Sequence, residues 1–148
     1  MSSKREILQT LVRGIRQDIE GYKQLKSLLN RQRELMQRRD NDGLRHHNQH
    51  QTRLCDELMV KAKKRSDALN QLGFSEDANG MKKLIDKLPK QSSLQVNLLW
   101  ENLLALVKES QQTNEANGKL LVSQQTVINN LLSRDTEKNV DYGASKGL

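Results

Sequence analysis

The sequence predicts an all-α protein, an elongated antiparallel bundle of long amphipathic helices: an N-terminal helical hairpin, a short third helix and a long C-terminal helix. Hydrophobic residues make up only 34% of the 148 residues and aromatic residues 3%, which is too little apolar material for a thick core. Helices that meet along narrow apolar seams need less of it. Proline occurs only once, at Pro89, so little interrupts helix growth.

The first half of the chain predicts the hairpin. From Lys4 to Arg39, apolar side chains recur every seven residues, at Leu8, Ile15, Tyr22, Leu29 and Met36. Residues 40–43, Asp-Asn-Asp-Gly, predict a turn, and a second helix is expected from Leu44 to Leu72, where Gly73 fits a left-handed stop. Two helices joined by so short a turn pack antiparallel.

Polar residues interrupt both seams of this hairpin. Gln32 breaks the apolar stripe of the first helix, and three polar residues stand at heptad-related positions of the second, namely His47, Gln51 and Arg65. The second seam is therefore expected to be the thinner one.

The second half predicts one short and one long helix. Ser75 is expected to cap the short helix, which Pro89 ends, and the long helix runs from about Ser92 to Ser133. Its middle, residues 108–119, carries no large apolar side chain, but the 3–4 spacing resumes in phase after it, so we expect continuous helix. Residues 1–133 are expected to form a single helical bundle domain, and residues 134–148 a flexible C-terminal tail.

The net charge of +7 lies entirely in residues 1–73, where 16 Lys and Arg stand against 9 Asp and Glu. A solvated helix surface and a surface for an acidic partner or nucleic acid both fit this excess. The basic runs lack aromatic residues suited to base stacking, so we expect no nucleic-acid partner. No secretory signal and no run of about 20 apolar residues occurs, which predicts a cytoplasmic protein without membrane insertion.

We expect no enzyme, no metal and no cofactor. His46 and His50 are one helical turn apart, but a third ligand is missing, because Cys55 lies off their face. Cys55 is the only cysteine, so an internal disulfide is excluded, and a buried structural thiol is expected. Neither a phosphate-binding glycine loop nor a cleft for a nucleophile and its base is indicated. The remaining functional class is a protein that works by binding another protein.

The C-terminal part of the long helix has more apolar residues than one seam needs. They lie on more than one face after Gly118, at Leu120, Leu121, Val122, Val127, Ile128, Leu131 and Leu132. The hairpin can cover only part of this surface, and an amphipathic helix with spare apolar surface is suited to bind a helix of another protein. Simple core membership of Leu121, Ile128 and Leu132 stays open.

Two asparagines and a glycine precede this apolar segment. Asn114 and Asn117 are interpreted as a buried polar layer that fixes helix register, with a partner contact as the alternative. Gly118 is costly inside a helix, and we expect a neighbouring helix to approach its backbone closely.

The second half resembles the FlgN family of flagellar type III export chaperones in three motifs. The first is a tryptophan in an apolar helical stretch, LLWENLLALV at 98–107. The second is Asn-x-x-Asn-Gly followed by an apolar pair, at 114–121. The third is the segment YGASKG, at 142–147. The first half agrees with the family only in its helix pattern.

The resemblance implies a chaperone of bacterial flagellum biogenesis and protein transport. Such chaperones hold the hook–filament junction proteins FlgK and FlgL before export and deliver them to the export gate protein FlhA. By the resemblance, the C-terminal region binds the client, and Tyr142 with Gly143 contacts the gate. Whether the clients are FlgK, FlgL or both stays open, as does a homodimer. The alternative is a basic helical nucleic-acid-binding protein or a coiled-coil scaffold.

Overall fold

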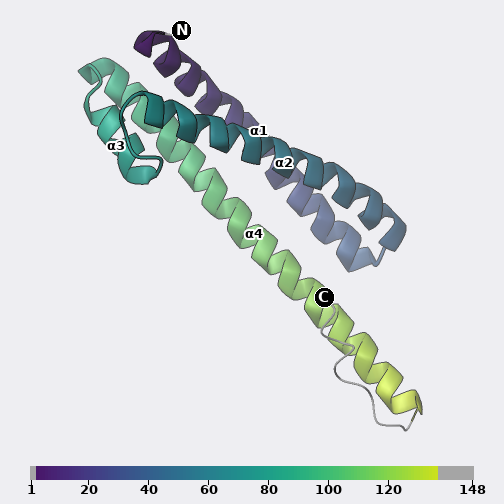
Figure 1. Cartoon of the computed structure of the whole chain (residues 1–148). Helices are drawn as coiled ribbons and strands as arrows, with labels where there is room; N and C mark the ends of the chain where they lie inside the picture. Colours follow the sequence, from purple (N-terminus) through teal and green to yellow (C-terminus); the bar gives the residue numbers. More distant parts are fainter. Residues whose placement is uncertain (1–2, 137–148) are drawn as a thin grey trace.

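A computed structural model describes the backbone of residues 3–136 and the side chains of residues 3–121. The described residues form four helices and no strand: α1 (Lys4–Arg38), α2 (Asn41–Gln71), α3 (Ala78–Asp86) and α4 (Lys90–Thr136) (Figure 1). The predicted all-α bundle is confirmed. Helix α4 continues three residues past the expected start of the tail, and the rest of that tail, residues 137–148, lies outside the described residues.

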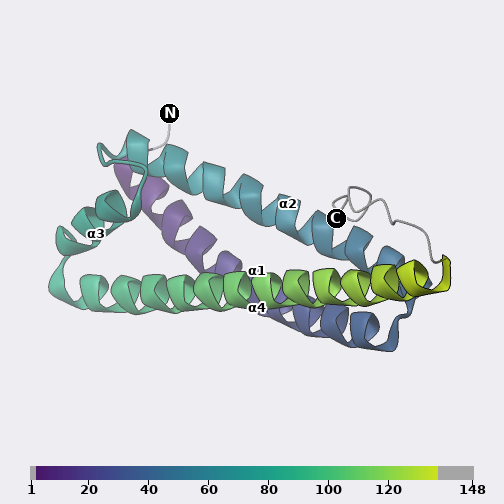
Figure 2. The ribbon, with the colours of Figure 1, turned by 90° about the horizontal axis from the view of Figure 1, so that it is seen from below.

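Helix α1 lies between the two other long helices and packs closely against both of them, whereas α2 contacts α4 mainly through side chains near α3. Figure 2 shows that α2 runs antiparallel to α1, and that α4 starts beside the N-terminal end of α1 and runs in the same direction as α1. The short helix α3 lies at the end where α2 stops and α4 begins. The molecule is therefore long and thin, as the low apolar content predicts.

The hairpin turn between α1 and α2 is shorter than expected. Arg39 takes a left-handed conformation with φ of 58°, and the amide of Asp40 donates to the carbonyl of Leu35 at 3.0 Å. The Asp40 carboxylate accepts from the amide of Gly43 at 2.9 Å and so caps α2. Because Asp40 is the cap, the chain is already helical at Asn41, three residues before the predicted start.

The end of α2 follows the prediction, and the start of α3 does not. Gly73 has φ of 86°, and the amide of Phe74 donates to the carbonyl of Leu69 at 2.9 Å, which confirms the left-handed stop. The predicted cap at Ser75 is wrong. Asp77 caps α3 by accepting from the amide of Gly80 at 3.0 Å, and Ser75 supports it by donating its hydroxyl to the Asp77 carboxylate at 2.7 Å.

Helix α4 is continuous through residues 108–119, so the expected continuity is confirmed. It begins at Lys90, directly after Pro89 and two residues before the expected start. Its 47 residues make it about 70 Å long at 1.5 Å per residue.

The apolar core consists of two clusters. The larger joins α1, α3 and α4 with the end of α2 around Ile15, Met81 and Leu103, which are fully buried. The smaller is a seam between α1 and α2, formed by Leu25, Leu29 and Leu58. The thick part of the molecule is thus the end that holds α3, and the hairpin tip is held by a narrow seam.

The close approach of two helices at a glycine occurs at another position than expected. The close helix approach expected at Gly118 is wrong, because a Cβ added there would meet nothing within 4 Å. The close approach occurs at Gly21 of α1, where an added Cβ would lie 2.7 Å from the Leu58 Cδ2 of α2.

Candidate protein-binding site

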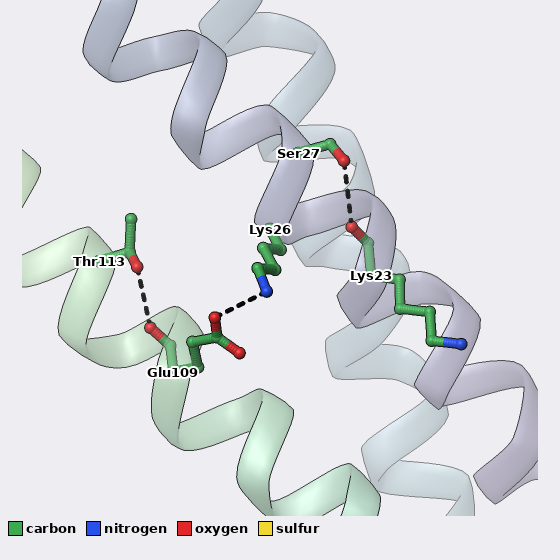
Figure 3. Close-up of polar contacts among 5 residues, drawn as sticks. All are labelled: Lys23, Lys26, Ser27, Glu109 and Thr113. Carbon is green, nitrogen blue, oxygen red and sulfur yellow. Dashed lines mark hydrogen bonds and ion pairs between the residues drawn. The ribbon is translucent and has the colours of Figure 1, made fainter.

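The polar middle of α4, residues 108–119, packs against α1. Ser110 and Asn117 are buried, and Thr113 is half-buried. Figure 3 shows Lys26 of α1 reaching Glu109 of α4, with a distance of 2.8 Å between the ammonium and the carboxylate. The Thr113 hydroxyl donates to the carbonyl of Glu109 at 3.1 Å. Polar contacts thus replace apolar ones along this part of the seam.

A polar layer around Gln32 joins α1, α2 and α4. The Asn117 side-chain amide donates to the carbonyl of Leu29 at 2.9 Å and to the Gln32 side-chain oxygen at 3.1 Å. Gln32 in turn donates to the Asn48 side chain at 2.9 Å, and Gln51 donates to Gln32 at 3.5 Å. The residue that breaks the α1 stripe therefore lies opposite polar residues of both neighbouring helices.

This layer holds α4 to the hairpin less strongly than an apolar layer would. The side-chain oxygens of Asn117 and Gln51 are buried and have no hydrogen-bond partner among the described residues. Asn117 is 3% exposed, whereas Asn114 is exposed, so the expected structural role applies to Asn117 alone. A buried polar residue in a helix seam specifies register at a cost in stability.

Beyond the polar layer, the last apolar side chains that the structure describes on α4, Leu120 and Leu121, are only partly covered. Leu121 lies one helical turn past the buried Asn117, on the same side of the helix, yet its side chain is 41% exposed. Leu120 is half-buried. Figure 1 shows the reason: α4 continues past the turn of the α1–α2 hairpin, so no helix of the described part faces its last turns.

The remaining predicted site residues fall outside the described side chains. The backbone at Val127, Ile128, Leu131 and Leu132 is helical within α4. Tyr142 and Gly143, the expected gate contacts, lie outside the described residues altogether.

A second polar group joins the same three helices nearer α3. The Arg65 guanidinium donates to the Asp18 carboxylate at 2.6 Å and lies 5.4 Å from the centre of the Trp100 ring. The Asp18 side chain is only 4% exposed, and this burial raises the pKa of its carboxyl even though the Arg65 charge acts to lower it. Arg65 is one of the polar seam residues of α2, and Trp100 belongs to the first of the three motifs.

Of the three histidines and the cysteine, only His47 packs against another helix, and the others lie on the surface. His46 and His50 are exposed, and the described residues contain no group of three side chains able to hold a metal. His47 instead lies against α1, with its Nε2 2.7 Å from the carbonyl of Leu28. The expected burial of Cys55 is wrong, because α2 packs mainly on α1 and leaves this side of the helix exposed. Partial desolvation, and then the charge of Asp56, raise the pKa of its thiol.

Several exposed apolar residues were missed by the sequence reasoning. Met59 is 72% exposed on α2 beside Val60, and α4 exposes Leu94, Leu98 and Leu104 besides Leu121. All of them stand off the 3–4 stripes of their helices, and a large apolar residue off the stripe is the signal that could have identified them.

No helix within residues 3–136 combines the length and the apolarity that crossing a membrane requires.

A long helix that extends past its own bundle, with Leu121 partly exposed where the cover ends, is suited to bind a helix of another protein. The chain belongs to the FlgN family, since the family model described as FlgN protein matches residues 1–148. This match extends the resemblance from the second half to the first. The family is one of flagellar export chaperones, so the general role of the protein is that of a chaperone. No match was found among the curated proteins or among the solved structures.

Proposed function

We propose that the protein is a cytoplasmic export chaperone that binds hook–filament junction proteins of the FlgK and FlgL type and delivers them to the export gate protein FlhA. The client-binding surface is the C-terminal part of α4, formed by Leu120, Leu121, Val127, Ile128, Leu131 and Leu132. The observation that carries this assignment is the 41% exposure of Leu121 on the side of α4 that is buried one turn earlier.

Apolar burial accounts for the affinity of such a surface. A client helix laid along the last turns of α4 removes apolar area from water at about 25 cal/mol per Å². The polar layer at Asn117 separates this surface from the core, so a client can bind there without competing with the packing around Leu103. The fold therefore supports a division of α4 into a structural part and a binding part.

Replacing Leu121 with aspartate tests the client-binding surface. We expect at least tenfold weaker binding of purified FlgK or FlgL, because a carboxylate would have to be desolvated at the centre of the contact. Isothermal titration calorimetry measures the dissociation constant. Leu98→Asp is the matched control, since Leu98 is 68% exposed on another face of α4 and should change the constant less than twofold. Equal weakening by both variants, or none by Leu121→Asp, would contradict the assignment.

The gate contact is proposed for Tyr142 and Gly143, which lie beyond the bundle domain. We expect Tyr142→Ala to retain the client and to lose capture of the FlhA cytoplasmic domain in a pull-down, because the aromatic ring supplies most of the apolar area of this short segment. Removing residues 134–148 should have the same effect. Tyr142→Phe keeps the ring and should retain part of the capture. Unchanged capture of the FlhA cytoplasmic domain by the Tyr142→Ala variant would contradict the role assigned to the tyrosine.

A further inference from the structure

A shallow apolar groove lies at the end of the molecule opposite to the proposed client-binding surface. It has a volume of about 430 Å³ and is formed by the first turns of α1, the start of α4 and the connection between α3 and α4. Its apolar lining consists of Leu8, Val12, Leu88, Val96 and Leu99. All of these except Val96 are only partly buried, so the groove presents apolar surface that no described segment covers.

Two unpaired cations border this groove. Arg13 and Arg16 of α1 line it, both are exposed, and neither forms an ion pair within the described part of the chain. No aspartate or glutamate is among the residues that line it. An apolar floor with cations on one side is complementary to an amphipathic segment that carries carboxylates beside its apolar stripe.

The C-terminal segment of the same chain cannot fill the groove. From Ser92, which lines the groove, to Thr136, the straight helix α4 spans about 66 Å at 1.5 Å per residue. Residues 137–148 reach at most about 40 Å even when fully extended. A second copy of the chain is disfavoured as the occupant as well, because each copy carries a net charge of +7 and would bring further positive charge to Arg13 and Arg16.

We propose that this groove binds an acidic amphipathic helix of a partner protein, with apolar residues on Val12 and Leu99 and carboxylates on Arg13 and Arg16. The stretch from Leu8 to Arg16 is about 12 Å long, so it accommodates roughly two helical turns. The groove lies about 33 Å along α4 from Leu121, counted from Leu99. It is therefore a second interaction surface, separate from the one proposed for the client.

A synthetic peptide probe tests the groove with the full-length protein. The probe is a fluorescein-labelled amphipathic helix of 15 residues with leucine at helical spacing and glutamate on the flanking positions. Fluorescence anisotropy measures its dissociation constant. We expect the double variant R13E/R16E to weaken binding at least tenfold and to favour the same peptide with lysine in place of glutamate. The matched control R33E/R38E changes the net charge equally at exposed positions outside the groove and should change the constant less than threefold.

Several outcomes would overturn the proposal. Equal loss of binding in both double variants would show that the peptide responds only to net charge. Loss of peptide binding in Leu121→Asp would place the peptide on the client surface. Absence of amide chemical-shift changes at Val12 and Val96 on peptide addition would exclude the groove directly. A dimer mass in light scattering that R13E/R16E reduces to the monomer would make a second copy the occupant.

Discussion

Replacement of Arg65 with alanine is expected to lower the free energy of unfolding by about 3 kcal/mol at pH 8. The reason is the position of Asp18, whose side chain is only 4% exposed and whose second carboxylate oxygen already has no hydrogen-bond partner. Without the guanidinium at 2.6 Å, a buried charge loses its counter-ion, and the Trp100 ring loses the cation that lies over it. Urea unfolding followed by circular dichroism measures the change.

The pH dependence of this loss has a defined sign. The pKa of Asp18 is raised in the folded state, so the folded protein binds this proton more tightly than the unfolded chain does. Stability from this group is therefore fully present below the unfolded pKa and declines as the pH rises through the folded pKa. Removing Arg65 raises that pKa further, because the Arg65 charge acts to lower it. The deficit of Arg65→Ala should be large at pH 8 and shrink as the pH falls through the folded-state pKa of Asp18, because a protonated carboxyl needs no counter-ion.

Lys64→Ala is the matched control for Arg65→Ala. Lys64 lines a shallow depression between α1 and α2 together with Asp18 and Arg65. It is exposed and forms no ion pair in the described part of the chain. Its removal should therefore change the free energy of unfolding by less than about 0.5 kcal/mol. A pH-independent deficit in Arg65→Ala, or a deficit of the same size in Lys64→Ala, would contradict the role of the Asp18–Arg65 pair.

Replacement of Gly80 with alanine is expected to destabilise the fold by about 3 kcal/mol. A Cβ at this position would lie 1.8 Å from the backbone carbonyl oxygen of Ser75, so the connection between α2 and α3 has to move. Hydrogen bonds from the Ser75 hydroxyl, from the Gly80 amide and from further backbone groups hold the pKa of the Asp77 carboxyl below its ordinary value. The movement of the connection breaks the bond from the Gly80 amide. It also displaces Met81, which is fully buried in the larger core cluster.

The same substitution at Gly118 should have the opposite sign. Gly118 is exposed inside α4, and an added methyl group meets nothing within 4 Å, so Gly118→Ala gains helix propensity of about 0.5–1 kcal/mol. Thermal unfolding of the two variants side by side makes the comparison. Destabilisation by both, or by neither, would show that the close approach at Ser75 does not govern the effect of Gly80→Ala.

Some bounds of the helices could be read from the sequence because the signals that set them are local. Apolar residues at seven-residue spacing predicted α1 to within a residue, and Gly73 marked the end of α2 because a left-handed stop favours glycine. The cap of α3 could not be decided in this way. Ser75 and Asp77 are both suited to capping, and the path of the chain from α2 selects Asp77.

Burial could be predicted only for residues on the stripes. Ile15 and Leu29 stand on the predicted seven-residue stripe of α1, and both are buried. Cys55 and Gly118 were placed wrongly because their surroundings depend on which side of a helix has a neighbour. Helix α2 packs mainly against α1, so the side of α2 that carries Cys55 has no covering helix.

Hydrophobic periodicity acts over a few turns of one helix, so it was sufficient to predict long amphipathic helices with an apolar surplus after Gly118. The pairing of the polar residues depends instead on the tertiary structure. Arg65 meets Asp18 across 47 residues, and Asn117 meets Gln32 across 85, through the relative register of helices that local periodicity does not specify. The tertiary structure also decided that Leu121 is only partly covered, because α1 ends at Arg38 while α4 continues to Thr136.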